Sequence, residues 1–164
     1  MPTPTYTLID SVTLSSSAAS VTFSSITQDY RDLVLVAQPL SLTASDFGGS
    51  SNITFNGDTG TNYSYVRMTG NGSTTDSSSG TQNRIPGPFQ NNSTYNDLFI
   101  CQIMDYSATD KHKTVLMKKA PLPAEVGAFA HRWANTAAIT SITFTGISGD
   151  FAAGSTFYLY GIEA

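Results

Sequence analysis

Residues 141–162, with the sequence SITFTGISGDFAAGSTFYLYGI, decide the fold class of this chain. Two runs of β-branched and aromatic residues flank a loop that contains Gly, Asp and Ala, which is the pattern of two β-strands joined by a turn. The second run includes Phe157 and Tyr160 and stops two residues before the end of the chain. We therefore expect this closing strand to lie inside a sheet, with earlier strands laid around it, in an all-β protein.

The composition supports the same fold class. A chain of 164 residues suits one domain with one core. Only 12% of the residues are charged, so the sequence holds little of the Lys and Glu that exposed helices use, while its abundant Thr favours strands. We expect a single domain over residues 6–164. Pro2 and Pro4 favour an extended N-terminal arm over residues 1–5.

The charge pattern bears on the kinds of partner. A net charge of −4 and a pI near 4.8 argue against nucleic acid, because binding phosphates requires clustered Lys and Arg. The one basic cluster, residues 111–119, is small. No charged segment followed by an apolar run opens the sequence, and no run of 18 apolar residues occurs. We expect a soluble protein without an export signal and without a membrane partner.

Three predicted strands are apolar on both faces: residues 33–37, 98–104 and 115–117. Both faces of such a strand must be covered, whereas a sandwich strand usually keeps one face in water. The cover comes either from a flanking loop or from a neighbouring subunit, and the sequence leaves these two alternatives open. If a subunit covers them, the candidate interface residues are Leu33, Leu35, Leu98, Ile100 and Leu116.

The central part of the chain is rich in Gly, Ser, Asn and Thr. Asn56 and Gly57 tolerate positive φ, so they predict a hairpin or a slightly longer loop between two strands. Residues 69–82 have the composition of a surface loop. Lys113 and Lys118 flank a short apolar run and predict an edge strand that is protected against unwanted pairing.

No catalytic, metal or cofactor motif is evident. The only glutamates are Glu125 and Glu163, and most aspartates adjoin turn-forming residues, so paired carboxylates for catalysis are not indicated. His112 and His131 have no local signature of a triad or a zinc site. The single cysteine, Cys101, lies in an apolar run, where a small buried side chain is the favoured interpretation. We expect no enzyme activity and no cofactor.

A sugar-binding platform is one interpretation of the strictly alternating residues 127–134. Phe129, His131 and Trp133 share one face there, and the alanines and Arg132 share the other. With Tyr63 and Tyr65, the aromatic face offers stacking surfaces with polar tips. The alternative is that Phe129 and Trp133 belong to the core and the alanines lie outside. We favour this alternative, because a domain of this size needs large core side chains.

Seven segments resemble a group of small virion proteins of tailed bacteriophages, common in phages of aquatic bacteria. They are YTLI at residues 6–9, VTFSSI at 21–26, DLVLV at 32–36, FNGD at 55–58, NYSY at 62–65, NTAAITSI at 135–142 and GSTFYLYGI at 154–162. The resemblance covers nearly the whole chain, and its motifs are turns and strands. It implies an antiparallel β-sandwich of jelly-roll type on the exterior of a phage particle, and it implies no catalytic residues.

The expectation that follows is a capsid decoration or cement protein. Such a protein is made in the host cytoplasm, associates as a homotrimer and bridges subunits of the major capsid protein on the virion. The alternative is a tail-fibre or receptor-binding module that binds host carbohydrate. Its contact residues would be Trp133, His131, Tyr63 and Tyr65.

Overall fold

The computed structural model describes residues 4–40, 51–87, 98–119, 126–147 and 149–163 of the chain. Regular structure in these residues consists of strands without a helix, so the predicted all-β class is confirmed. The strands are β1 (Tyr6–Thr13), β2 (Ser20–Phe23), β3 (Asp32–Gln38), β4 (Ser51–Phe55), β5 (Tyr63–Gly70), β6 (Thr75–Gln82), β7 (Ile85–Pro86), β8 (Phe99–Met104), β9 (Lys113–Lys119), β10 (Val126–Trp133), β11 (Ile142–Gly146) and β12 (Thr156–Ile162).

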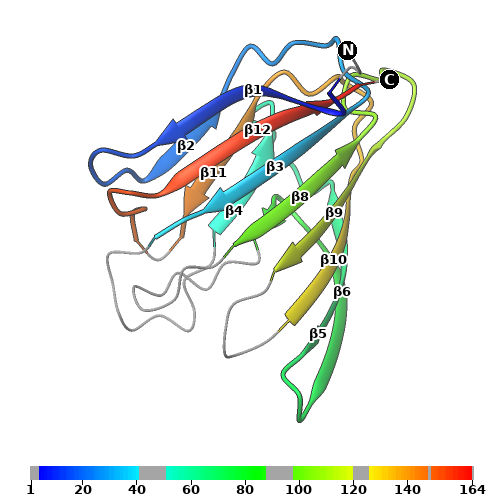
Figure 1. Ribbon diagram of the computed structural model, residues 1–164. Helices are drawn as coiled ribbons and strands as arrows, with labels where there is room; N and C mark the ends of the chain where they lie inside the picture. Colours follow the sequence, from blue (N-terminus) through cyan, green and yellow to red (C-terminus); the bar gives the residue numbers. More distant parts are fainter. Residues whose placement is uncertain (1–3, 41–50, 88–97, 120–125, 148, 164) are drawn as a thin grey trace.

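The strands form two facing sheets (Figure 1). The larger sheet has eight strands in the order β1-β12-β3-β8-β9-β10-β5-β6, and the smaller has four in the order β2-β11-β4-β7. The groups β1-β12-β3-β8 and β2-β11-β4-β7 together have the strand order of a jelly roll, the arrangement of two facing four-stranded sheets. The predicted antiparallel, jelly-roll sandwich is therefore confirmed.

Four strands are additions to this jelly roll. β5 and β6 are inserted between β4 and β7, and β9 and β10 between β8 and β11. Antiparallel pairing of β10 with β5 joins the two inserted pairs, and pairing of β9 with β8 attaches them to the jelly roll. The larger sheet therefore continues well past the smaller one, with the β5–β6 hairpin at its far end (Figure 1).

The closing strand lies within the sheet, as predicted. β12 pairs with β1 on one side and with β3 on the other. Its inward side chain Phe157 packs against Phe144 and Phe151, at ring-centroid distances of 5.5 and 5.3 Å. This strand therefore joins the first strand of the chain to the centre of the fold and anchors the contact between the two sheets.

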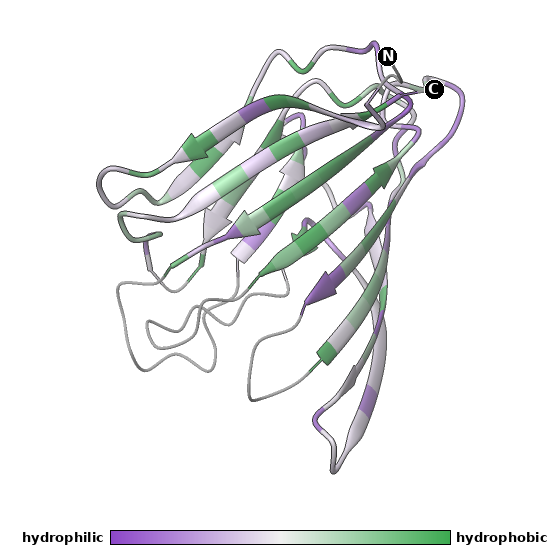
Figure 2. Ribbon diagram, in the orientation of Figure 1, coloured by the Kyte–Doolittle hydropathy of each residue, from purple (hydrophilic) through white to green (hydrophobic). Residues whose placement is uncertain are grey.

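The core lies between the sheets and is lined by every second residue of each strand. In β3, Leu33 and Leu35 are fully buried, whereas Val34 and Val36 are half-buried on the other side of the sheet. Figure 2 shows β3 hydrophobic along almost its whole length. The prediction that Leu33 and Leu35 contact a partner is wrong, because their side chains fill the core of their own domain.

The local pattern of two strands departs from simple expectation. The predicted loop 69–82 contains strand β6, whose Ser and Thr residues pair with β5 along its full length. A bulge at Ile9 changes the facing of β1. Leu8 is exposed, whereas Ile9 and Val12 pack against the core, because the extra residue reverses the alternation.

The turn after β4 has the predicted backbone conformation but a different role. Asn56 and Gly57 have φ values of 54° and 68°. The strands that they connect do not pair with each other, because β4 belongs to the smaller sheet and β5 to the larger one. The turn therefore carries the chain from one sheet to the other. Asn56 also fixes the segment before β11, since its Nδ2 donates to the carbonyl of Ala138 at 2.7 Å.

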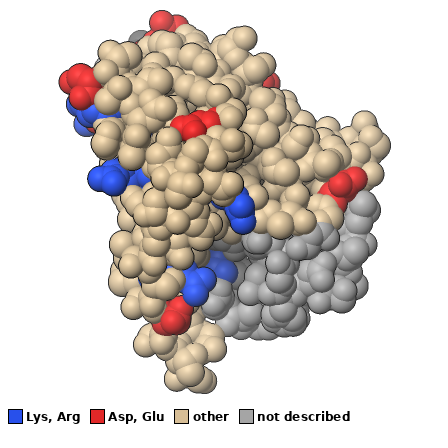
Figure 3. All heavy atoms as spheres, turned by 180° about the vertical axis from the view of Figure 1, so that it is seen from behind, with Lys and Arg blue, Asp and Glu red and all other residues tan. Residues whose placement is uncertain are grey.

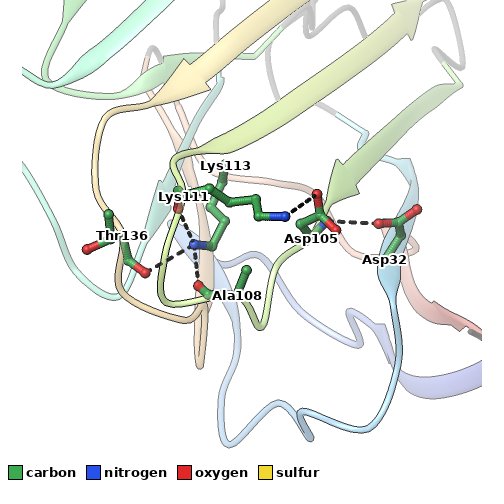
Figure 4. Close-up of polar contacts among 6 residues, drawn as sticks. All are labelled: Asp32, Asp105, Ala108, Lys111, Lys113 and Thr136. Carbon is green, nitrogen blue, oxygen red and sulfur yellow. Dashed lines mark hydrogen bonds and ion pairs between the residues drawn. The ribbon is translucent and has the colours of Figure 1, made fainter.

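Lys113 does not mark an edge strand. β9 lies in the interior of the larger sheet, between β8 and β10, and Lys113 is fully buried. Its Nζ donates to the carbonyl oxygens of Ala108, Lys111 and Thr136 at 2.6, 3.0 and 3.2 Å (Figure 4). A buried ammonium requires such partners, so this lysine ties the β8–β9 turn to the segment that follows β10.

Candidate functional site

The most unusual surface of the described structure is the side of the larger sheet that faces away from the smaller sheet, here called the outer face. Strand register aligns its side chains in two rows that cross all eight strands. One row is Leu8, Tyr160, Val34, Gln102, Leu116, Ala130, Val66 and Ser79; the other is Ser11, Tyr158, Val36, Ile100, Lys118, Ala128, Met68 and Ser77. Both rows are apolar over most of their length.

Large apolar side chains on this face are exposed to solvent. Met68 is 62% exposed, Val66 54%, Ile100 44% and Leu116 40%. An antiparallel sheet with one solvated face normally carries polar residues there. A contiguous apolar surface of this kind marks a site of interaction with another molecule. The outer face is therefore the candidate functional site.

The outer face divides into two unlike halves. Large side chains project from β1 and β12 in the first half, named the knob half: Tyr6, Leu8, Tyr158 and Tyr160. Tyr6 and Leu8 are 58% and 51% exposed, and the rings of Tyr158 and Tyr160 stack at a centroid distance of 6.4 Å. The second half, on β9, β10 and β5, contains a groove and is named the groove half.

Small residues of β10 form the floor of the groove. Ala128 and Ala130 lie between the larger side chains of β9 and β5, leaving a hollow of about 490 Å³. Its walls include Leu116 and Ile100 on one side and Val66 and Met68 on the other; each alanine is paired across the sheet with one residue of each neighbouring strand. The inserted strands therefore build a concave apolar site that is absent from the jelly roll itself.

The groove becomes polar toward the end of β10. A second hollow of about 450 Å³ shares Val66 and Ala130 with the first and extends to Arg132. Hydroxyl groups surround Arg132 there, because Ser64 and Thr114 are its cross-strand neighbours. The groove thus runs from an apolar part to a cationic part along a single strand.

Charge on the groove half is exclusively positive among the described residues. Lys118 and Arg132 line the groove together with apolar and hydroxyl residues, and the described lining includes no carboxylate. Neither cation forms an ion pair with another described residue. Seen from behind, on the side of the smaller sheet, charged residues are sparse and scattered (Figure 3). The groove is therefore a local positive site on a chain with a net charge of −4.

Three of the five predicted interface residues lie on the outer face. Ile100 and Leu116 line the groove, and Leu98 is 49% exposed just before β8. The sequence interpretation missed Val66, Met68 and the role of the alanines. The available signal was the strict alternation of β10, which places Ala128, Ala130 and Arg132 on one face.

The proposed sugar platform is wrong. Trp133, Tyr63 and His131 are 0%, 1% and 3% exposed, and only Tyr65 is partly accessible. Trp133 stacks on Tyr63 at 6.3 Å inside the core. The alternative interpretation is confirmed: Phe129 and Trp133 belong to the core and the alanines lie outside. A sugar ring cannot reach side chains that the fold itself covers.

Buried His131 has an unusual environment. Its ring stacks on Phe129 at a centroid distance of 6.3 Å, and neither of its nitrogens has a hydrogen-bond partner. Burial lowers the pKa of His131 to about 4, because an apolar surrounding disfavours the charged imidazolium. The residue is therefore neutral at physiological pH and packs as a core side chain.

Other chemically reactive groups are dispersed or buried. The described residues contain no group of three or more His, Cys, Asp and Glu side chains placed to hold a metal ion. Cys101 is fully buried, as predicted, and burial raises the pKa of its thiol. Within the described ranges, no helix has the length and apolar character needed to cross a membrane.

Comparison with known proteins assigns neither a family nor a function to this chain. No protein-family model and no curated protein matches the sequence. Among solved structures, the crystal structure of a human SPRY domain is similar over 88% of this chain and 96% of that chain, with 12% sequence identity and a TM-score of 0.21. The class that the strands themselves define is a jelly-roll β-sandwich extended by two inserted strand pairs.

Proposed function

We propose that this chain is a structural protein that acts by docking its outer face against other subunits, and not by catalysis. The observation that carries the proposal is the pair of apolar rows that cross the eight-stranded sheet. Leaving such a surface in water is unfavourable by roughly 25 cal/mol for each Å² of apolar area. Association with a complementary surface removes that cost.

The specific form of the proposal is a decoration or cement protein of a tailed bacteriophage. Copies of the chain associate as a homotrimer, and the trimer binds the major capsid protein on the exterior of the virion. Two observations support it: the resemblance of seven segments to small virion proteins, and the jelly-roll topology, which recurs in viral capsid proteins. A fold by itself does not define a role, so the particle is where the proposal is tested.

The test uses an outer-face variant and a matched control. Leu116→Glu places a charge on the wall of the groove, and Ser20→Glu places the same charge at an exposed position of the smaller sheet. We expect the wild type and Ser20→Glu to associate and to bind expanded heads assembled without this chain. We expect Leu116→Glu to lose both properties while remaining folded. The proposal is overturned if the wild type fails to bind heads, or if Leu116→Glu binds as the wild type does.

A further inference from the structure

We infer that the outer face is self-complementary: the knob half of one copy docks into the groove half of a second copy. This inference rests on the proposed docking through the outer face and specifies which surfaces meet. The knob half presents large side chains, and the groove half presents a hollow floored by two alanines. Both are parts of one sheet, separated by β3. They therefore cannot contact each other within a single chain, and a second copy is required.

Spacing along the strands supports this contact. Alternate residues of a strand point to the same face and lie about 6.6 Å apart. Ala128 and Ala130 have this relation in the groove, and Tyr158 and Tyr160 have it in the knob half. Sheets that pack face to face keep their strands within about 30° of each other. Consecutive knobs can therefore enter consecutive positions above the alanines.

Size also suits the contact. The hollow of about 490 Å³ lies in the range of sites that enclose whole small molecules, so it has room for Leu and Tyr side chains. Seven strand spacings of about 4.8 Å make the outer face roughly 34 Å wide. This width is close to that of a standard protein interface, which covers about 800 Å² on each partner. A reciprocal contact that covers both halves of each face therefore approaches the standard size, whereas a single knob-to-groove contact covers about half of it.

Charge repulsion disfavours contact between two groove halves. The groove half carries Lys118 and Arg132, whereas the knob-half side chains on the outer face, Tyr6, Leu8, Tyr158 and Tyr160, are uncharged. Superposing two groove halves would bring the cations of both copies together, with no carboxylate in the described lining. Placing the uncharged knob half over the groove avoids this repulsion. Like-charge repulsion of this kind disfavours one orientation relative to another.

Contacts between unlike halves are compatible with closed assemblies. A contact between different patches generates a ring when the rotation between copies closes. Three copies joined knob to groove would form the trimer of the proposed function.

The experiment mixes variants that are each defective in one half. Leu8→Lys places a cation in the knob half, and Ala130→Tyr fills the groove; both positions face solvent, so neither change disturbs the core. Ile147→Lys is the matched control, because Ile147 is an exposed apolar residue, 44% accessible, outside the outer face. Sedimentation velocity measures association, and the emission of Trp133 reports that each variant is folded.

We expect each defective variant alone to associate at least about tenfold more weakly than the wild type, which corresponds to about 1.4 kcal/mol. Ile147→Lys should associate as the wild type does. A mixture of equal amounts of Leu8→Lys and Ala130→Tyr should recover association, because one variant keeps an intact groove and the other keeps intact knobs. A mixture of Ala128→Tyr and Ala130→Tyr should not recover it, since both grooves are filled.

Several outcomes would overturn the inference and are distinct from failure of the proposed function. If the wild type is monomeric but still binds heads through Leu116, docking through the outer face is supported and the self-complementary contact is ruled out. If Leu8→Lys associates as the wild type does, self-association uses another surface. The same conclusion follows if the mixture of Leu8→Lys and Ala130→Tyr does not recover association. Binding of Leu116→Glu to heads at wild-type strength contradicts the proposed function itself.

Discussion

The indole Nε1 of Trp133 donates a 2.7 Å hydrogen bond to Oδ2 of Asp58. Trp133 is the last residue of β10, and Asp58 lies in the loop that carries the chain from the smaller to the larger sheet. The same carboxylate accepts hydrogen bonds of 2.8 Å from the backbone N–H of Gly60 and from the side-chain amide of Asn62. One charged group therefore ties the loop to the strand that floors the groove.

We expect Asp58→Asn to lower the free energy of unfolding by about 2 kcal/mol, because the neutral amide cannot accept all three hydrogen bonds and places its own donors against other donors. Urea denaturation, monitored by Trp133 emission, measures the change. Asp76→Asn is the control. Asp76 pairs with Arg67 at 3.0 Å on the exposed surface, so its loss should cost less than about 1 kcal/mol. Equal effects of the two substitutions would contradict the structural role of Asp58.

Because His131 is buried in its neutral form, we expect the protein to lose stability in mild acid. Burial lowers its pKa from 6.5 to about 4, so the folded state binds a proton less readily than the unfolded state does. The contribution of neutral His131 to the free energy of unfolding is therefore fully present above pH 6.5. It is lost as the pH falls from 6.5 toward 4, by roughly 3 kcal/mol in total.

We expect His131→Leu to remove this part of the pH dependence, because leucine does not titrate and needs no hydrogen bond. Urea denaturation of both proteins between pH 7.5 and pH 4.0 measures the difference. His112→Leu, at an exposed position, should keep the wild-type slope. If the two variants show the same pH dependence, His131 does not control acid stability.

We expect substitution of Lys113 to have a large effect on the free energy of unfolding. Lys113→Met preserves the length of the side chain but leaves the carbonyl oxygens of Ala108, Lys111 and Thr136 without their donor. We expect a loss of about 2–4 kcal/mol, since each hydrogen bond to a charged group contributes roughly 1.5–3 kcal/mol before the structure relaxes. Lys118→Met on the outer face should change stability by less than about 0.5 kcal/mol. Thermal unfolding that shows Lys113→Met to be as stable as Lys118→Met would refute the assignment.

The closing strand β12 has no room for a side chain at Gly161 unless a neighbour moves. A Cβ atom at this position would overlap the ring of Tyr30, which lies over the glycine. We expect Gly161→Ala to destabilise the protein by about 1–3 kcal/mol, because the ring must shift away from its packed position. At Gly70, by contrast, an added Cβ meets its nearest neighbour at 3.8 Å, so Gly70→Ala should be neutral or slightly stabilising. Differential scanning calorimetry of the two variants tests the distinction.

Periodicity in the sequence was sufficient to predict the strands whose two faces differ most. The alternation of β10 separated Phe129 and Trp133 from Ala128 and Ala130, and the structure shows these two sets on opposite sides of the sheet. It was insufficient for β6, because a strand made of Ser, Thr and Gly has no apolar face and resembles a loop in composition. Pairing with β5 supplies the strand order that composition does not indicate.

Residue pattern alone was enough to predict an all-β protein, a closing strand within a sheet, and strands that are apolar on both faces. Which of those faces is covered depends on how the strands assemble in three dimensions. Leu33 and Leu116 are equally apolar in sequence, yet one fills the core and the other is 40% exposed. Local sequence cannot show this, because coverage depends on pairing between strands far apart in the chain. Two inserted strand pairs extend the larger sheet past the smaller one, and this extension creates the groove.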